Sequence, residues 1–265
     1  MSNTFAFKEV LNYTVQTYSA TGVGGAVQFF VDYAKDSSVA TTGERLDIRG
    51  GQGNYKLLSM DHSKDATFKA TLPLLDTSAL TSMTGKALVT GATQVPKREV
   101  ITITVAGTMT LAQTPVNGSL KIYKLLNNRD ISTEQIVGTP ATVENQYTIS
   151  TATVTLNVTT GAIGTKFLCV YDYTSTALAK KMTITANNFP GYVRITGDAL
   201  AVDESDGLTY PVKFDIKKAK VKPGFEWTFA SDKATEIPFE YDLFPVVNAS
   251  GDMVFFETTV LGESI

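Results

Sequence analysis

The chain has 265 residues, of which 43% are hydrophobic and 18% are charged, and its formal net charge is -3. With a single cysteine and this share of apolar residues, it is neither disordered, collagen-like nor held together by disulfides. One large β domain and two smaller domains are both compatible with this length.

The sequence also lacks the segments typical of membrane proteins, of secreted proteins and of proteins that bind nucleic acid or lipid. No apolar run approaches the roughly 18 residues of a membrane span, so we expect no membrane partner. Residues Met1 to Val10 do not combine a basic region with an apolar stretch, and no secretory signal is expected. The 23 basic and 26 acidic residues form no block typical of nucleic-acid or lipid binding.

Short alternating runs of Thr, Val, Ile, Tyr and Phe, broken by Gly, Asn, Asp and Pro, dominate the chain. Such alternation places the apolar side chains of a strand on one face. The sequence therefore predicts a mainly β protein with a β-sandwich or barrel core.

The first third of the chain predicts one short helix. Asp76 can accept hydrogen bonds from the amides of a first helical turn, and Gly85 can take the left-handed conformation that ends a helix. The apolar residues between these ends share one face: Leu75, Ala79, Leu80 and Met83. The opening segment, Phe7 to Val15, fits either a second helix or an extended arm, because its periodicity favours neither.

The middle third has a strand set of its own, rich in Thr, Val and Asn. Asn117-Gly118 predicts a two-residue hairpin turn, since both residues tolerate positive φ. Phe167 to Tyr171 is apolar at every position, which predicts a central strand covered on both faces.

Two shifts in composition mark the domain boundaries, near Pro96-Lys97-Arg98 and near Ala179-Lys180-Lys181. We expect residues 1–96 and 182–265 to form one discontinuous β core domain. Residues 97–181 are then an inserted module, long enough for a small immunoglobulin-like β-sandwich.

The last third is the most regular part of the sequence. Val212, Phe214 and Ile216 alternate with charged residues, and the phase then flips to Ala219 and Val221. Because a slip of one residue would turn the apolar row toward water, we expect a bulge near Lys217-Lys218. Two further aromatic-rich strands should follow, and Pro238 favours an edge or the start of a strand. The predicted core residues are Leu80, Phe214, Ile216, Phe225, Trp227, Phe229, Phe239 and Tyr241.

The chain offers little for catalysis or metal binding. His62 is the only histidine, which removes most metal sites and most general bases. A nucleophile pair of Cys169 and His62 is compatible with the sequence, but Cys169 alternates with Phe167 and Tyr171, where a buried thiol is expected. The glycine-rich segments lack the spacing of a phosphate-binding loop. We therefore predict no catalytic residue, no metal and no cofactor.

Three stretches combine into a pattern that covers most of the chain. The first is Gly50 to Tyr55 running on to His62-Ser63-Lys64, and the second is the helix segment Asp76 to Gly85. The third extends from Phe189-Pro190-Gly191 to Leu243-Phe244 and contains the run Ile216 to Val221. Together they resemble the major tail tube proteins of tailed bacteriophages, within the fold family of phage tail and type VI secretion tubes.

The resemblance implies a structural protein of the virion that is made in the host cytoplasm and is not an enzyme. Protomers of this family assemble into six-membered rings, whose inner sheets join around a channel, and the rings stack into a tube. The partners implied are further copies of the chain, the tail-terminator, baseplate or tail-tip and tape-measure proteins, and genomic DNA that passes without sequence-specific binding. An inserted module of about 80 residues is expected on the outside.

By the same analogy, the joints between rings or subunits fall on Ser2 to Val15, on the loop Lys35 to Tyr55 and on Phe255 to Ile265. The interface residues implied are Asn3, Phe5, Phe7, Arg45, Asp47, Arg49, Gln52, Asn54, Glu257 and Glu263. Two alternatives stay open: another virion or surface β protein, such as a capsid, decoration or adhesive protein, and a carbohydrate-active enzyme with a pair of carboxylates.

Overall fold

The computed structural model describes residues 4–9, 11–20, 24–74, 76–127, 129–224, 226 and 236–262. The chain divides into two compact units. The core unit comprises Met1–Leu88 and Thr183–Ile265, and the central unit comprises Val89–Met182. β-Strands make up most of both units, which confirms the predicted fold class, and one helix occurs among the described residues.

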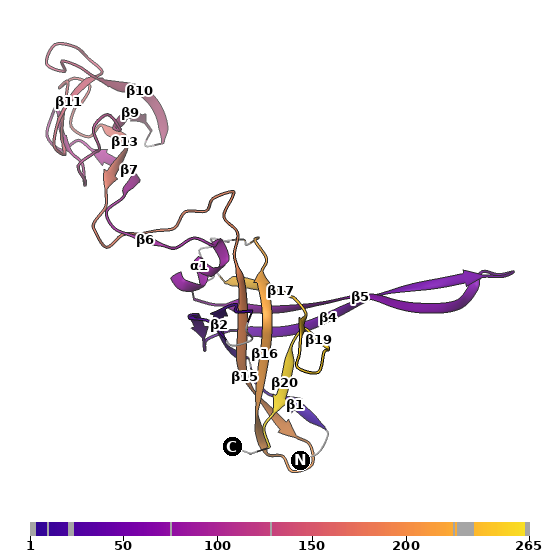
Figure 1. Ribbon diagram of the computed structural model, residues 1–265. Coiled ribbons are helices and arrows are strands. Elements are labelled where there is room, and N and C mark those ends of the chain that lie inside the picture. The colour runs from indigo at the N-terminus through magenta and orange to yellow at the C-terminus, as the bar shows by residue number, and fades with distance from the viewer. Residues whose placement is uncertain are drawn as a thin grey trace. The chain divides into compact units, whose positions relative to one another are not determined.

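A nine-stranded sheet builds the core unit (Figure 1). Its order is β3-β2-β15-β16-β17-β5-β4, with β1 added beside β15 and β20 beside β16. The strands are β1 (Phe5–Phe7), β2 (Asn12–Thr17), β3 (Val27–Val31), β4 (Asp36–Gly50), β5 (Tyr55–Leu72), β15 (Tyr192–Asp203), β16 (Thr209–Val221), β17 (Ile237–Leu243) and β20 (Glu257–Val260). The short strands β18 (Val246–Val247) and β19 (Met253–Val254) pair with each other.

The core of this unit is an aromatic cluster between strands distant in sequence. The Tyr13 ring meets the Phe68 ring edge-on at 5.2 Å, and Phe68 lies 5.9 Å from Tyr241. Because apolar residues alternate with polar ones along each strand, the sheet presents one apolar face, and that face is buried. Of the predicted core residues, Leu80, Ile216, Phe239 and Tyr241 are buried and Phe214 is half-buried, whereas Phe225, Trp227 and Phe229 lie outside the described residues.

The bulge predicted in β16 is confirmed. The register of β15 and β16 shifts between two pairs, Val193 with Ala219 and Ile195 with Ile216. One residue of β15, Arg194, therefore lies opposite two residues of β16, Lys217 and Lys218, and the extra residue falls there. The bulge keeps Ile216, Ala219 and Val221 all buried although their spacing breaks alternation.

The predicted helix is also confirmed, as α1 (Thr77–Thr84). The Asp76 carboxylate accepts from the Ser78 amide at 2.8 Å, and Gly85 ends the helix with φ 68°. A side chain at position 85 would bring its Cβ within 2.6 Å of the Phe189 carbonyl oxygen, so glycine is required there.

The central unit is a seven-stranded sheet in the order β7-β13-β9-β10-β11-β12-β8. Its strands are β7 (Gln94–Thr102), β8 (Thr108–Thr110), β9 (Lys121–Leu126), β10 (Asp130–Val137), β11 (Gln146–Ser150), β12 (Thr153–Leu156) and β13 (Lys166–Thr174). The apolar faces of these strands enclose one core cluster that includes Ile122, Phe167 and Tyr171. The immunoglobulin-like class stays a prediction for this unit.

Two details of the central unit differ from the sequence-based expectation. Strand β13 is central, between β7 and β9, but its Val170 side chain is exposed, so only one face is covered. Asn117-Gly118 forms a turn, closed by the Ser119 amide donating to the Val116 carbonyl at 3.0 Å, yet its flanking strands do not form a hairpin. Strand β8 pairs with β12 instead, and β9 with β10 and β13.

The chain enters and leaves the central unit through one short strand pair. Strand β6 (Val89–Thr90) pairs with β14 (Lys180–Lys181). The Gly91 amide extends this pair by donating to the Ala179 carbonyl at 2.9 Å.

Candidate assembly surfaces

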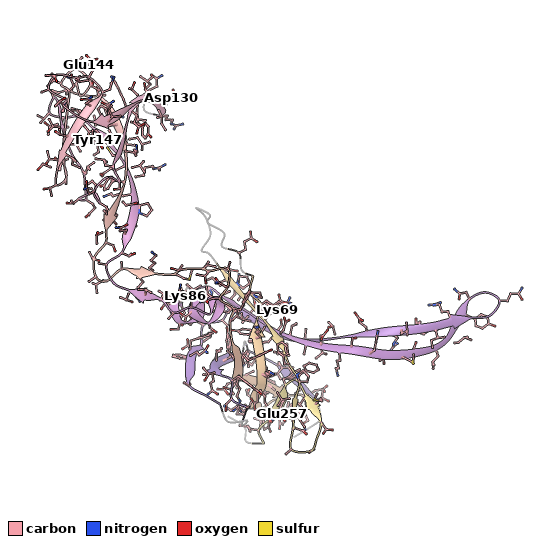
Figure 2. All side chains as sticks on the ribbon, turned by 45° about the horizontal axis from the view of Figure 1, so that its top comes forward. Lys69, Lys86, Asp130, Glu144, Tyr147 and Glu257 are labelled. Carbon is pink, nitrogen blue, oxygen red and sulfur yellow. The ribbon has the colours of Figure 1, made fainter. Side chains whose placement is uncertain are left out.

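The most extended feature of the core unit is a two-stranded ribbon formed by β4 and β5 (Figure 1). The strands pair from Asp36 with Thr71 to Gly50 with Tyr55, so the predicted loop Lys35 to Tyr55 is wrong for most of its length. The base of β5 also pairs with β17, through residues 66–72. Beyond the base, we call residues 42–64 the outer ribbon; its side chains project from the unit past Lys69 (Figure 2).

One face of the outer ribbon carries four apolar side chains in two cross-strand pairs, Leu46 with Met60 and Ile48 with Leu58. We call these four the apolar row. Their side chains are 41–54% exposed, although residues of this kind are normally buried. An apolar strand face in water is stabilised by a partner that covers it.

The opposite face of the outer ribbon is held by ion pairs. Arg45 Nε lies 2.6 Å from Asp61 Oδ1, and Asp47 Oδ1 lies 2.7 Å from Lys56 Nζ. Hydrogen bonds from Lys56 and then Ser59 lower the pKa of the Asp47 carboxyl. These ion pairs are largely exposed, so each contributes little to stability. They define a charged face of the ribbon, and the apolar row occupies the opposite face.

The predicted interface residues of the segment 35–55 all lie on this ribbon. Arg45, Asp47 and Arg49 belong to its charged face, where the Arg49 guanidinium is 3.7 Å from Asp47. Gln52 and Asn54 lie in the terminal turn, which the Asn54 amide closes by donating to the Gly51 carbonyl at 3.0 Å. The apolar row was missed, although Leu46 and Ile48 alternate with charged residues as in a strand.

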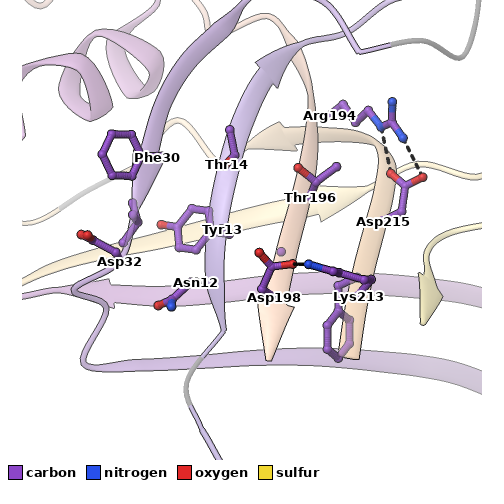
Figure 3. A pocket seen from close by; sticks show the side chains of 13 residues that line it. Asn12, Tyr13, Thr14, Phe30, Asp32, Arg194, Thr196, Asp198, Lys213 and Asp215 are labelled. Carbon is purple, nitrogen blue, oxygen red and sulfur yellow. Dashed lines mark hydrogen bonds and ion pairs between the residues drawn. The ribbon is translucent and has the colours of Figure 1, made fainter. Parts of the chain in front are cut away.

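A second surface is the outer face of β2, β3, β15 and β16, which is hollowed by about 410 Å³ and lined by polar and charged side chains together with the exposed Phe30 ring (Figure 3). Two ion pairs cross from β15 to β16. Arg194 binds Asp215 through two hydrogen bonds, of 2.9 and 2.8 Å, and Lys213 Nζ lies 2.5 Å from Asp198. The hydrogen bond with Asp215 raises the pKa of the Arg194 guanidinium. Both cations of this hollow are thus paired with a carboxylate within the chain, and Asp32 adds a further acidic side chain to its lining.

Four described strands of the same sheet pair with one neighbour each: β1, β3, β4 and β20. Of the strands that the structure describes, β3 pairs with β2 alone, and β20 pairs with β16 alone. The Leu261 amide donates to the Pro211 carbonyl at 2.9 Å, which sets the phase of β20. Because hydrogen-bonded positions alternate along an antiparallel pair, the Val260 amide points away from β16. Both edges can therefore accept a further strand.

The remaining predicted interface residues lie near the ends of the chain. Phe5 and Phe7 are on β1, and the exposed Phe7 ring is 6.0 Å from the Phe214 ring. Glu257 begins β20 and forms a 3.0 Å ion pair with Lys217. Asn3 and Glu263 lie outside the described residues.

The residues weighed for catalysis, Cys169 and His62, belong to different units. Cys169 is buried in the central unit, where burial and the charge of Glu99 raise the pKa of its thiol to about 12. His62 is on the outer ribbon of the core unit, 3.7 Å from Glu44. Within the described ranges, no cluster of acidic, histidine or cysteine side chains could hold a metal ion. No helix in those ranges has the length and apolarity to cross a membrane.

Comparison with known proteins places the chain in a family. A model of the YomU/Tube protein family matches residues 9–256, across both units and the ribbon. No curated protein matches the chain. The family is one of structural tube proteins, and membership indicates a phage tail component that assembles with itself into a tube. The chain belongs to the YomU/Tube protein family.

Proposed function

We propose that this chain is the protomer of a tail tube made of stacked hexameric rings around a channel for DNA. The observation that carries the proposal is a pair of strands with a free edge: β3, which ends the strand order of the sheet, and β20, which lies beside β16. A neighbour that docks its β20 edge on the β3 edge of this chain satisfies both rows of backbone groups. Repetition of this contact around an axis closes the sheet into a barrel.

The polar outer face of that sheet suits the wall of the channel. Its opposite face is covered by the aromatic core, so the face with Arg194, Asp215, Asp198 and Lys213 is the one left to line the barrel. Arg194 and Lys213 are each bound to a carboxylate there, and Lys218 and Lys220 of β16 pack against the Tyr192 ring. Pairing of cations with carboxylates weakens the attraction of the wall for phosphates. DNA passes such a wall without sequence-specific binding.

The proposal extends to the inserted module and to the partners of the tube. Residues 97–181 lie on the outside of the tube as an added module. The protein is made in the host cytoplasm, acts without enzymatic activity or cofactor, and meets tail-terminator, baseplate or tail-tip and tape-measure proteins at the tube ends.

Electron microscopy of the purified protein tests the proposal, with rings and stacked tubes expected. The decisive variant is Val260→Pro, which removes an amide that points to the free edge of β20 and spares the bonds to β16. It should stay a folded monomer, whereas the control Val260→Thr, which keeps the amide, should form rings like the wild type. A strictly monomeric wild type, or rings from Val260→Pro as abundant as those from the wild type, contradicts the proposal.

A further inference from the structure

The central unit contains a cleft of its own, to which the proposed tube function gives no role. It lies between the segment 114–121, the end of β10 and strand β11, and its volume is about 500 Å³. Sites for small molecules in proteins measure about 300–1,000 Å³, so the cleft has the size of a binding site. All the residues that line it belong to the central unit, so an inference from it does not depend on tube assembly.

Gln135 gives the cleft an unpaired acceptor. Its side chain is 1% exposed, and its register partner is Ile122 of the core cluster. The amide nitrogen donates to the Thr133 carbonyl at 3.4 Å, but no donor among the described residues reaches the Oε1 atom. A buried amide oxygen without a hydrogen bond is destabilising, and buried polar groups are normally paired. A donor that enters the cleft would supply the missing hydrogen bond.

Other polar groups of the central unit are satisfied within the chain. The Tyr147 hydroxyl, which also lines the cleft, donates to the Leu120 carbonyl at 3.1 Å. The buried Thr160 hydroxyl accepts from the Asn145 amide at 3.4 Å. Within the described part of this unit, Gln135 Oε1 is the one buried side-chain oxygen or nitrogen without a partner. The unpaired acceptor is therefore a property of the cleft and not of a loosely packed core.

The charges in the cleft neutralise each other. Lys121 Nζ lies 2.9 Å from Glu134 Oε1, and these are the two charged residues among the described ones that line the cleft. Thr114, Asn117 and Thr151 are exposed at its rim and carry further donors and acceptors. The cleft therefore suits a neutral ligand with several polar groups.

The rest of the wall is aliphatic. Ile136, Val137 and Ile149 line the cleft and are between 39% and 71% exposed, so they offer apolar contact to C–H groups. An apolar cavity of about 150 Å³ holds a benzene ring, so the cleft has room for roughly one to three six-membered rings.

A sugar fits these requirements better than a peptide strand does. A saccharide ring combines hydroxyl donors with C–H faces and carries no charge. A peptide strand would need a free backbone edge, but the end of β10 is already paired with β11, through Ile136 with Gln146 and Val137 with Tyr147.

We propose that this cleft binds a neutral saccharide, one hydroxyl of which donates to Gln135 Oε1. The Lys121–Glu134 pair and the Asn117 amide bind further hydroxyl groups, and Ile136 and Ile149 contact the C–H face of the ring. The central unit thereby has a glycan-binding role that is separate from tube formation.

Saturation-transfer NMR of the full-length protein tests the site, because the method also works on large assemblies. The probes are glucose, galactose, N-acetylglucosamine, cellobiose and lactose, and saturable binding of at least one is expected. Gln135→Met keeps the shape of the side chain but removes the acceptor, and it should weaken this binding by ~10-fold or more. Its melting temperature should equal or exceed that of the wild type, because an unpaired buried group is lost. A purely structural role of Gln135 would lower it.

Two further variants keep the test decisive. Gln94→Met is the matched control, because Gln94 is an exposed glutamine of β7 outside the cleft, and its affinity should equal that of the wild type. Asn117→Ala alters the exposed rim, so it should unfold at the wild-type temperature and bind the same sugar ~3-fold or more weakly.

The outcomes separate the cleft from the tube. Absence of binding by all five sugars overturns the proposal, as does equal affinity in the wild type, Gln135→Met and Asn117→Ala. Binding of a neutral peptide of alternating Thr and Val in place of the sugars overturns the choice of ligand. Rings and tubes of Gln135→Met should match the wild type in electron micrographs, and a wild type without rings refutes the proposed function but not the sugar site.

Discussion

The base and the outer part of the β4–β5 ribbon belong to the same two strands but have opposite surroundings. At the base, Ala66, Phe68, Ala70 and Leu72 are fully buried against the core. In the outer ribbon, apolar side chains of the same kind are about half exposed. The two strands stay paired through both parts, with register shifts between Gly43 and Glu44 and between Ile48 and Arg49. The main difference between the parts is what covers their apolar side chains. Burial of apolar side chains stabilises the protomer at the base, whereas the apolar side chains of the outer part contribute little to protomer stability.

Removing the outer ribbon should have the largest effect and separate the two roles completely. Replacing residues 44–63 by Asn-Gly leaves the register pair Gly43 and Lys64 beside a two-residue turn. We expect tubes to disappear in electron micrographs, while the melting temperature changes by less than about 4 °C. A fall well beyond that range would show that the outer ribbon stabilises the protomer.

A substitution at the base should do the reverse. Phe68 is buried and contacts the Tyr13 and Tyr241 rings, so Phe68→Ala should lower the free energy of unfolding by about 3–5 kcal/mol. Leu58→Ala, on the apolar row, should change it by less than about 0.5 kcal/mol. Chemical denaturation measures both, and similar losses at the two positions would remove the distinction.

The smallest effect concerns a carboxylate beside the base. Lys222 hydrogen-bonds Glu240, and this bond lowers the pKa of the Glu240 carboxyl. Because the folded pKa is below the unfolded value of about 4.3, the stabilisation is full above that value and lost as the pH falls through the folded pKa. Between pH 5 and 3, the free energy of unfolding should fall less in Glu240→Gln than in the wild type, by on the order of tenths of a kcal/mol. An identical pH profile in both proteins would contradict this.

Features set by local chemistry could be predicted from the sequence. The caps of α1 follow from Asp76 and Gly85, and the bulge at Lys217–Lys218 follows from one flip in the alternation. Both depend on residues within one turn or one strand. The mainly β class follows for the same reason, since alternation is a local signal.

Features that depend on distant partners could not be predicted in this way. Asn117-Gly118 encodes a turn but not which strands pair around it, and β8 pairs with β12 far along the chain. The alternation in Leu46 and Ile48 signals a strand, yet the glycines and charges around it resemble a loop. Phe214 fits the alternating pattern of its strand, and only the fold shows that it borders a groove shared with Phe7. Both this groove and the apolar row are recognised only once the exposure of the side chains is known.

The strand pair β6–β14 brings the two ends of the inserted segment together. Because Thr90 and Lys180 are register partners, the two ends of the segment between them lie side by side. An inserted segment with closely spaced ends disturbs its host little, since it imposes no stretch on the flanking strands. A segment of this kind can be exchanged for another of different sequence while the core unit stays unchanged.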